Sequence, residues 1–172
     1  GQVYEAFNMA SLWDLPVVYV IENNQYAMGT SVERASAETE LYKRGISFEI
    51  KGEMVDGMDV LAVKAAGKKA VAHARSGKGP YILEMKTYRY RGHSMSDPAK
   101  YRTKDELDKM RKEHDPIDMV KKLLIDASIL DEDGLKEIDK EVKAEVAKSA
   151  EFAQNSPEPN PSELFTDILI EV

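Results

Sequence analysis

Two polar segments of this 172-residue chain carry side chains suited to binding phosphate groups and hard metal ions. The first segment, residues 22–31, contains Asn23 and Asn24 shortly after an apolar run. Side-chain amide oxygens at such a position suit Mg²⁺, which prefers oxygen ligands. The alternative is ordinary turn chemistry, because asparagine tolerates the left-handed backbone conformations of loops. The asparagine pair by itself therefore leaves both a metal site and a plain turn open.

The second segment, residues 88–103, is locally basic, whereas the chain as a whole has a formal net charge of -7. Its basic residues are Arg89, Arg91, Lys100 and Arg102, and Lys104 follows directly. Guanidinium groups and imidazoles suit phosphate oxygens, which favours a phosphate-bearing ligand; a solvated charged loop is the alternative. His93 lies between Gly92 and Ser94, where no helix or strand pattern requires an imidazole. We therefore expect His93 to be the functional histidine, and His73 and His114 to be structural.

Composition excludes several classes of protein. The negative charge argues against a general nucleic-acid or membrane-surface binder, because phosphate-rich partners would be repelled. The absence of cysteine removes disulfides, thiolate metal sites and cysteine nucleophiles. No apolar run approaches the roughly 20 residues that a membrane-spanning helix needs. A hydrophobic content of 42% fits a globular domain with a core.

Alternating strand and helix patterns predict an α/β fold with a parallel sheet. Residues 17–21 form a continuous β-branched and aromatic run after Pro16, which predicts a strand buried on both faces. Residues 48–55 and 80–87 predict two further strands. Helices are predicted at residues 2–13, 38–44 and 59–75. Ligands in such sheets bind beyond the carboxyl ends of the strands, so we expect the two polar segments to face one edge.

From Lys104 onward the pattern is that of charged helices. They are predicted at residues 104–113, 116–127 and 131–153. Asp59, Asp115 and Asp131 are the expected N-caps of their helices, because a carboxylate there accepts unpaired backbone N–H groups. An apolar stripe along the last helix predicts packing on the sheet domain or on a partner helix. We expect the tail, residues 162–172, to dock as well.

Four stretches resemble the α subunits of thiamine-diphosphate-dependent 2-oxo acid dehydrogenases, most closely those of the pyruvate dehydrogenase E1 type. They are residues 22–34 (ENNQYAMGTSVER), 55–60 (VDGMDV), 76–80 (SGKGP) and 88–98 (YRYRGHSMSDP). The resemblance implies the C-terminal portion of such a subunit. Residues 1–103 would form the second half of its α/β domain for thiamine diphosphate and Mg²⁺, a parallel sheet flanked by helices. Residues 104–172 would be a helical region packing on it.

The resemblance also implies roles for individual residues. Asn24 matches a side-chain ligand of Mg²⁺, and Tyr26 matches the residue that gives its backbone carbonyl to the same ion. His93 matches a catalytic-loop histidine that contacts the cofactor diphosphate near the substrate channel. Ser94 and Ser31 match positions that are phosphorylated in mitochondrial relatives, where a phosphate beside the cofactor would repel it.

One departure concerns regulation. Lys100 occupies the place of a third such serine, in a loop one residue shorter than the family's. This difference favours a bacterial form without that regulation. The resemblance then implies the bacterial cytoplasm, or the mitochondrial matrix for a eukaryotic chain.

The implied reaction is the oxidative decarboxylation of pyruvate with acetyl transfer to a lipoyl-bearing E2. The implied assembly is an α2β2 heterotetramer with an E1 β subunit. Branched-chain 2-oxo acid and acetoin dehydrogenase α subunits are the alternatives within the family. A catalytically inactive assembly module is the alternative from another class.

A second departure is at the start of the chain. The family's cofactor motif opens with Gly-Asp-Gly and ends with Asn-Asn, and its spacer is longer than the 22 residues that precede Asn23. The opening half of the motif would therefore fall before Gly1. We expect a fragment lacking the N-terminal half, which alone is inactive and does not bind the cofactor productively.

Overall fold

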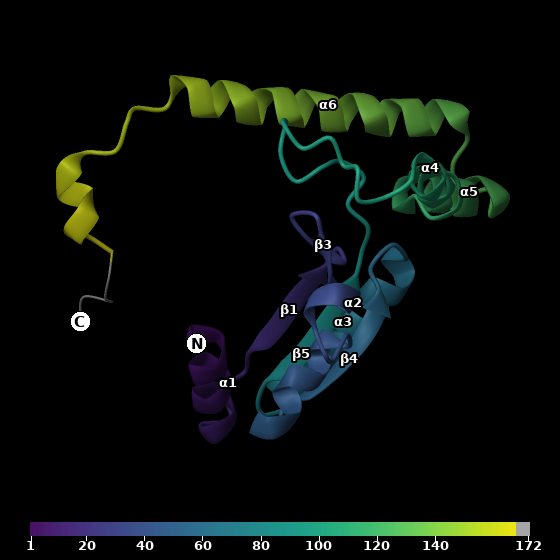
Figure 1. Cartoon of the computed structure of the whole chain (residues 1–172). Coiled ribbons are helices and arrows are strands. Elements are labelled where there is room, and N and C mark those ends of the chain that lie inside the picture. The colour runs from purple at the N-terminus through teal and green to yellow at the C-terminus, as the bar shows by residue number, and fades with distance from the viewer. Residues whose placement is uncertain (168–172) are drawn as a thin grey trace. The chain divides into compact units, whose positions relative to one another are not determined.

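The computed structural model describes residues 1–167, which divide into two compact units (Figure 1). The first unit comprises Gly1–Val120, and the second begins at Lys121. The first contains all the strands of the described residues, and the second is helical. Within residues 1–167, no helix combines the length and apolar character needed to cross a membrane.

A three-stranded parallel sheet forms the centre of the first unit. It consists of β1 (Val18–Asn23), β5 (Tyr81–Lys86) and β4 (Lys51–Asp56), in the order β1-β5-β4. Lys86 is in register with both Asn23 and Asp56, so the three strands end level with one another. The predicted α/β class, the parallel sheet and all three strands are thus confirmed, with boundaries shifted by up to three residues.

The burial of β1 differs from the prediction. Val18 packs against the hydrophobic core, but Val20 is 55% exposed. The continuous apolar run predicted a strand buried on both faces, and this prediction is wrong for the described residues. The reason is topological, because β1 is an edge strand of the three-stranded sheet and its neighbours cover only part of it.

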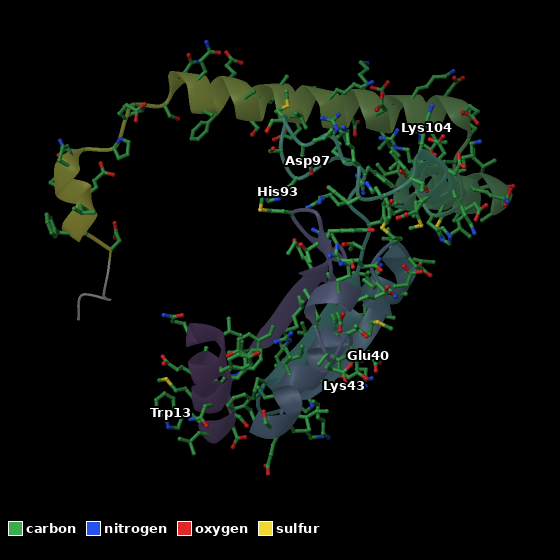
Figure 2. The ribbon with its side chains drawn as sticks, in the orientation of Figure 1. Trp13, Glu40, Lys43, His93, Asp97 and Lys104 are labelled. Carbon is green, nitrogen blue, oxygen red and sulfur yellow. The ribbon has the colours of Figure 1, made fainter. Side chains whose placement is uncertain are left out.

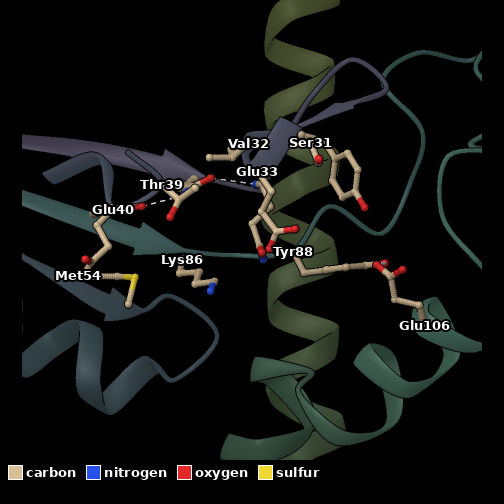
Figure 3. A pocket seen from close by; sticks show the side chains of 13 residues that line it. Ser31, Val32, Glu33, Thr39, Glu40, Met54, Lys86, Tyr88 and Glu106 are labelled. Carbon is tan, nitrogen blue, oxygen red and sulfur yellow. Dashed lines mark hydrogen bonds between the residues drawn. The ribbon is translucent and has the colours of Figure 1, made fainter. Parts of the chain in front are cut away.

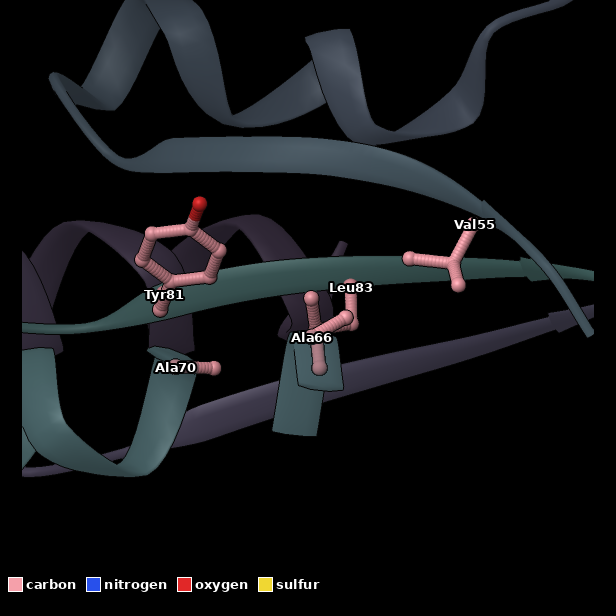
Figure 4. Packing of buried hydrophobic residues seen from close by; sticks show 5 residues of the cluster. All are labelled: Val55, Ala66, Ala70, Tyr81 and Leu83. Atoms are coloured by element: carbon pink, nitrogen blue, oxygen red, sulfur yellow. The ribbon is translucent and has the colours of Figure 1, made fainter. Parts of the chain in front are cut away.

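One face of the sheet is covered by α3 (Val60–Arg75). Small residues on the helix allow it to approach the strands closely. The resulting core cluster consists of Val55, Ala66, Ala70, Tyr81 and Leu83 (Figure 4). As predicted, Asp59 caps the helix by accepting hydrogen bonds from the backbone N–H groups of Leu61 and Ala62 at 2.9 and 3.1 Å. The helix ends at Arg75 with Ser76 as its C-cap, and Gly77 after it has a φ of 72° that suits glycine.

The opposite face is covered by α1 (Gln2–Leu12) and the 3₁₀ helix η1 (Leu41–Phe48). The core here is formed by Phe7, Ile50 and Ile82. Side chains alternate between the faces of a strand, so Ile82 points to this face and Leu83 to the other. The predicted helix at residues 2–13 is confirmed. The helix predicted at 38–44 is found three residues later and as a 3₁₀ helix.

Shorter elements follow the sheet. β2 (Tyr26–Ala27) and β3 (Thr30–Ser31) form an antiparallel hairpin, and α2 (Val32–Ala35) comes directly after it. The helices α4 (Lys104–Glu113) and α5 (Pro116–Asp126) lie where the sequence predicts them. The Asp115 carboxylate caps α5 by accepting from the backbone N–H of Ile117 at 2.9 Å.

The second unit contains the long helix α6 (Glu132–Asn155) and the 3₁₀ helix η2 (Pro161–Phe165). Asp131 caps α6 by accepting from the backbone N–H of Gly134 at 2.8 Å, as predicted. The apolar stripe of α6 is exposed at Ile138, Val142 and Val146 among the described residues. Of the tail predicted to dock, Leu164 and Phe165 are exposed, and residues 168–172 lie outside the described part.

Candidate functional site

The two polar segments meet at the carboxyl edge of the sheet, as predicted. The backbone N–H of Thr87 donates to the carbonyl of Asn23 at 2.9 Å, and the Gln25 side chain donates to the carbonyl of Thr87 at 3.3 Å. Farther out, the Arg89 guanidinium donates to the carbonyl of Met28 at 2.6 Å. The level ends of β1 and β5 explain this meeting, because each segment leaves its strand at the same height.

Two consecutive side-chain turns shape residues 23–26 of the first segment, which together we call the asparagine turn. The Asn23 Oδ1 accepts from the backbone N–H of Gln25 at 2.9 Å, and the Asn24 Oδ1 accepts from that of Tyr26 at 3.1 Å. Gln25, which follows the two asparagines, has a φ of 69°, in the left-handed region. An amide oxygen has two lone pairs, so Asn24 keeps one for a further partner. Turn formation and metal binding are therefore compatible at Asn24, although the sequence presented them as alternatives.

The donor set of this turn fits part of a magnesium shell. The Asn24 amide oxygen and the Tyr26 carbonyl are hard, neutral oxygen donors, and Mg²⁺ takes about six oxygen ligands in near-octahedral geometry. Among residues 1–167, no group of three or more His, Cys, Asp or Glu side chains is arranged to hold a metal ion. Phosphate oxygens, water and residues outside this range would have to complete such a shell.

A buried glutamate lies beneath the turn. Glu84 in β5 is 0% exposed, and its Oε1 accepts from the Asn23 side-chain amide at 2.7 Å. Its Oε2 accepts from the backbone N–H of Tyr42, near the start of η1, at 2.9 Å. The sequence analysis missed this residue. The only signal was a charged residue inside the apolar run of a strand.

A cavity of about 260 Å³ opens beside the turn (Figure 3). Its walls include Asn23, Tyr26, Glu84 and Tyr88. The Tyr88 hydroxyl donates to the Glu106 carboxylate at 2.9 Å, so α4 is tied to the same wall. The cavity thus lies at the carboxyl edge of the sheet, where α/β proteins commonly bind ligands.

The second polar segment folds around the Asp97 carboxylate. Asp97 accepts from the backbone N–H groups of His93 at 2.7 Å and Ala99 at 2.8 Å, and from the Tyr101 hydroxyl at 2.8 Å. These hydrogen bonds, led by the two backbone donors, lower the pKa of Asp97 from 3.8 to about 2. Gly92 is required close by, because a Cβ there would lie 2.6 Å from the Asp97 carbonyl oxygen.

Two arginines of this segment hold the loop together. Arg89 donates to the carbonyl of Met28 and, at 2.7 Å, to the Tyr101 hydroxyl. Arg102 donates to the carbonyls of Arg89 and Tyr90, the latter at 2.8 Å. The loop-structure interpretation therefore accounts for Arg102 and for one nitrogen of Arg89, whereas the buried Nε of Arg89 has no hydrogen-bond partner within residues 1–167. The other basic side chains, Arg91, Lys100 and Lys104, are exposed.

The imidazole of His93 is exposed on this loop and makes no hydrogen bond within residues 1–167 (Figure 2). A chain of contacts nevertheless links the loop to the asparagine turn. The rings of Tyr26 and Tyr101 lie 5.2 Å apart, Tyr101 donates to Asp97, and Asp97 accepts from the His93 backbone. The sequence analysis did not identify Tyr101, which is central to this link.

The two serines predicted as phosphorylation positions lie in different settings. Ser94 is exposed, and its hydroxyl lies 3.1 Å from that of Ser96. The Ser31 hydroxyl accepts from the backbone N–H of Arg34 at 3.4 Å and so caps α2. Modification of Ser31 would therefore replace a helix-cap interaction, whereas Ser94 has no comparable structural role.

The lowered pKa of Asp97 predicts that the loop keeps its structure in mild acid. A carboxyl whose folded pKa is depressed stabilises the structure above its unfolded pKa, and this effect is lost as the pH falls through the folded pKa. The backbone amide NMR signals of His93 and Ala99 should therefore not titrate between about pH 5 and about pH 3. In Asp97→Asn these signals should shift at neutral pH, whereas in Ser96→Ala they should not. A titration centred at 3.8 would contradict the prediction.

In a comparison with protein families, residues 1–162 match the family described as the dehydrogenase E1 component. The match spans both polar segments and the helices α1 to α6.

Curated relatives agree with this match. The pyruvate dehydrogenase E1 component subunit alpha of Rhizobium meliloti (strain 1021) is 69% identical over 170 residues, which cover 99% of this chain and 49% of the relative. The protein of the same name from Zymomonas mobilis is 54% identical, with shares of 99% and 48%. The mitochondrial somatic form of Bos taurus is 52% identical over 165 residues, with shares of 95% and 42%. The chain thus spans about half the length of the curated relatives that it matches.

Proposed function

Because the chain belongs to the dehydrogenase E1 component family, we propose that it is the cofactor-anchoring part of a pyruvate dehydrogenase E1 α subunit. The family generally depends on thiamine diphosphate. The observation that carries the proposal is the asparagine turn, which places two oxygen donors at the carboxyl edge of β1, beside a polar cavity. The names of the relatives support pyruvate as the substrate.

In this proposal each residue has a limited task. Asn24 and Tyr26 would hold Mg²⁺ through their oxygen atoms, and the ion would neutralise part of the charge of the cofactor diphosphate. His93 donates a hydrogen bond to the diphosphate from the loop that Asp97 organises. Thiamine diphosphate, when bound, supplies the chemistry of decarboxylation.

The proposed partners are an E1 β subunit in an α2β2 assembly and a lipoyl-bearing E2 that accepts the acetyl group. The proposed compartment is the bacterial cytoplasm, or the mitochondrial matrix for a eukaryotic chain. Ser94 and Ser31 are proposed regulatory phosphorylation positions. A phosphate dianion on Ser94 would be next to His93 in sequence and would repel the diphosphate that His93 contacts.

The proposal is tested with an α subunit that has the full length of the relatives, produced together with its β subunit. Pyruvate-dependent reduction of an artificial electron acceptor should require both thiamine diphosphate and Mg²⁺. Faster turnover of branched-chain 2-oxo acids or of acetoin would contradict the pyruvate assignment. An assembled complex that neither binds the cofactor nor turns over any of these substrates would overturn the proposal in favour of an assembly module.

Replacing His93 tests its proposed contact with the diphosphate. Loss of one hydrogen bond to a charged group costs about 1.5–3 kcal/mol, so His93→Ala should raise the half-saturating thiamine diphosphate concentration by at least about tenfold. The concentration is read from a cofactor titration of the α–β complex at saturating Mg²⁺. His114→Ala is the matched control, because its imidazole is also partly exposed and precedes α5. Equal cofactor affinity of the two variants would remove His93 from the site.

A further inference from the structure

The asparagine turn begins at Asn23, which forms a buried polar pair with Glu84. Among residues 1–167, Asn23 and Glu84 are the only buried polar or charged side chains, at 7% and 0% exposure. They are hydrogen-bonded to each other at 2.7 Å. A carboxylate removed from water is costly unless donors satisfy it. Glu84 has two such donors, the Asn23 side-chain amide and the backbone N–H of Tyr42.

This arrangement fixes the orientation of the Asn23 amide. Its nitrogen faces the Glu84 carboxylate, and its oxygen faces the backbone N–H of Gln25. In a flipped amide, oxygen would meet carboxylate and nitrogen would meet an N–H, so both contacts would become repulsive. Glu84 therefore determines which atom of Asn23 is available to Gln25.

The orientation of Asn23 matters for the residues that follow. The bond from Gln25 to Asn23 holds Gln25 at a φ of 69°, a conformation that residues other than glycine rarely adopt. The chain then turns so that Asn24 accepts from Tyr26. The directions of the Asn24 side chain and the Tyr26 carbonyl thus depend on a turn whose first residue, Asn23, is oriented by its hydrogen bond to Glu84.

We infer that Glu84 is a positioning residue for the metal-binding turn: through Asn23 it holds Asn24 and Tyr26 in the geometry that binds Mg²⁺. This inference rests on the proposed function. In the arrangement that we infer, Glu84 contacts neither the ion nor the cofactor. If Glu84 were only structural, its hydrogen bonds would link β5 to β1 and to η1. Its replacement would then lower the free energy of unfolding without changing Mg²⁺ binding.

The first test is Glu84→Gln in the full-length α subunit assembled with β. Glutamine keeps the shape but has one acceptor oxygen and one NH₂ group, so it accepts from Asn23 or from Tyr42 but not from both. One contact becomes donor against donor. We expect the half-saturating Mg²⁺ concentration for thiamine diphosphate binding to rise by about tenfold.

Exchanging the two groups provides a rescue. In the double variant Glu84→Gln with Asn23→Asp, the glutamine NH₂ donates to the new carboxylate and its carbonyl accepts from Tyr42. The same carboxylate accepts from the backbone N–H of Gln25, which restores the original pattern. We expect the Mg²⁺ concentration to return to within about threefold of the wild type. Asn23→Asp alone places two carboxylates together and should bind Mg²⁺ more weakly than the double variant.

Ile82→Val is the matched control for stability. Ile82 is fully buried, lies two residues before Glu84 and points to the same face of β5. Its truncation lowers stability without touching the turn, so the Mg²⁺ concentration should not change. A second measurement needs no cofactor: the amides of Gln25 and Tyr26 should exchange hydrogen faster in Glu84→Gln than in Ile82→Val.

The outcomes separate the inference from the proposed function. Weaker Mg²⁺ binding in Glu84→Gln, recovered in the double variant, supports the inference. If the wild type binds cofactor and Glu84→Gln behaves like Ile82→Val in both measurements, the inference is wrong and the proposed function stands. If the wild-type complex does not bind Mg²⁺ and cofactor at all, the proposed function is overturned, whatever the exchange rates show about the turn.

Discussion

Asn24→Ala is expected to raise the half-saturating Mg²⁺ concentration for thiamine diphosphate binding by roughly 100-fold, a larger effect than that expected for Glu84→Gln, because Asn24 is a proposed ligand of the ion. The substitution removes an oxygen ligand of the ion and also the acceptor for the backbone N–H of Tyr26, at 3.1 Å. Both losses act on the metal site, because Tyr26 is itself a proposed ligand. The measurement is a calorimetric titration of the full-length α–β complex at fixed Mg²⁺ concentrations.

Asn24→Asp separates the two losses. Aspartate keeps an oxygen that accepts from Tyr26, so the turn is retained, and it adds a negative charge that attracts the ion. Its Mg²⁺ requirement should therefore lie much closer to the wild type than that of Asn24→Ala. Equal and normal Mg²⁺ requirements in both variants would show that Asn24 is not a ligand.

The features predicted correctly from the sequence depend on neighbours along the chain. Asp59, Asp115 and Asp131 cap their helices as expected, because a cap bonds backbone groups only two or three residues away. The strands were recognised from runs of β-branched and aromatic residues for the same reason. The meeting of the two polar segments also followed, since parallel strands present their carboxyl ends together.

The features that were missed depend on which strand lies beside which. Val20 is exposed because β1 is an edge strand of this sheet, and nothing in its own sequence encodes that position. The partners of Glu84 are 61 and 42 residues away in sequence. Arg89 was predicted to contact phosphate, but one of its nitrogens donates to the Met28 carbonyl and to the Tyr101 hydroxyl. Such pairings become visible only when the sheet is assembled.

Asn24 shows how a local preference and a proposed function can share one residue. Asparagine favours this position because its side chain closes a turn onto Tyr26. The same turn leaves the Asn24 amide oxygen with a free lone pair, next in the chain to Asn23 and Gln25, which line the cavity. The sequence could only offer the two interpretations as competitors, whereas the geometry allows both at once. The Asn24 variants therefore test the contact between the ion and that lone pair.

Phe7→Ala is expected to lower the free energy of unfolding of the first unit by about 3–5 kcal/mol. Phe7 is 3% exposed, and its ring centroid lies 4.7 Å from that of Tyr19 and 6.0 Å from that of Phe48. It thereby joins α1 to β1 and to η1. Urea denaturation of the 172-residue chain, followed by circular dichroism, measures the loss.

Trp13→Ala is the control for Phe7→Ala, because tryptophan is the larger side chain but Trp13 is 58% exposed. Its removal should change the free energy of unfolding by no more than about 0.5 kcal/mol. If Trp13→Ala lowered the free energy of unfolding as much as Phe7→Ala, the contacts of exposed residues would stabilise α1 as much as the packing of Phe7 does. The packing of Phe7 also matters for the candidate site. Phe7 contacts Phe48 of η1, and η1 supplies the Tyr42 N–H that donates to Glu84. Loosening this layer should therefore weaken the support beneath the asparagine turn as well.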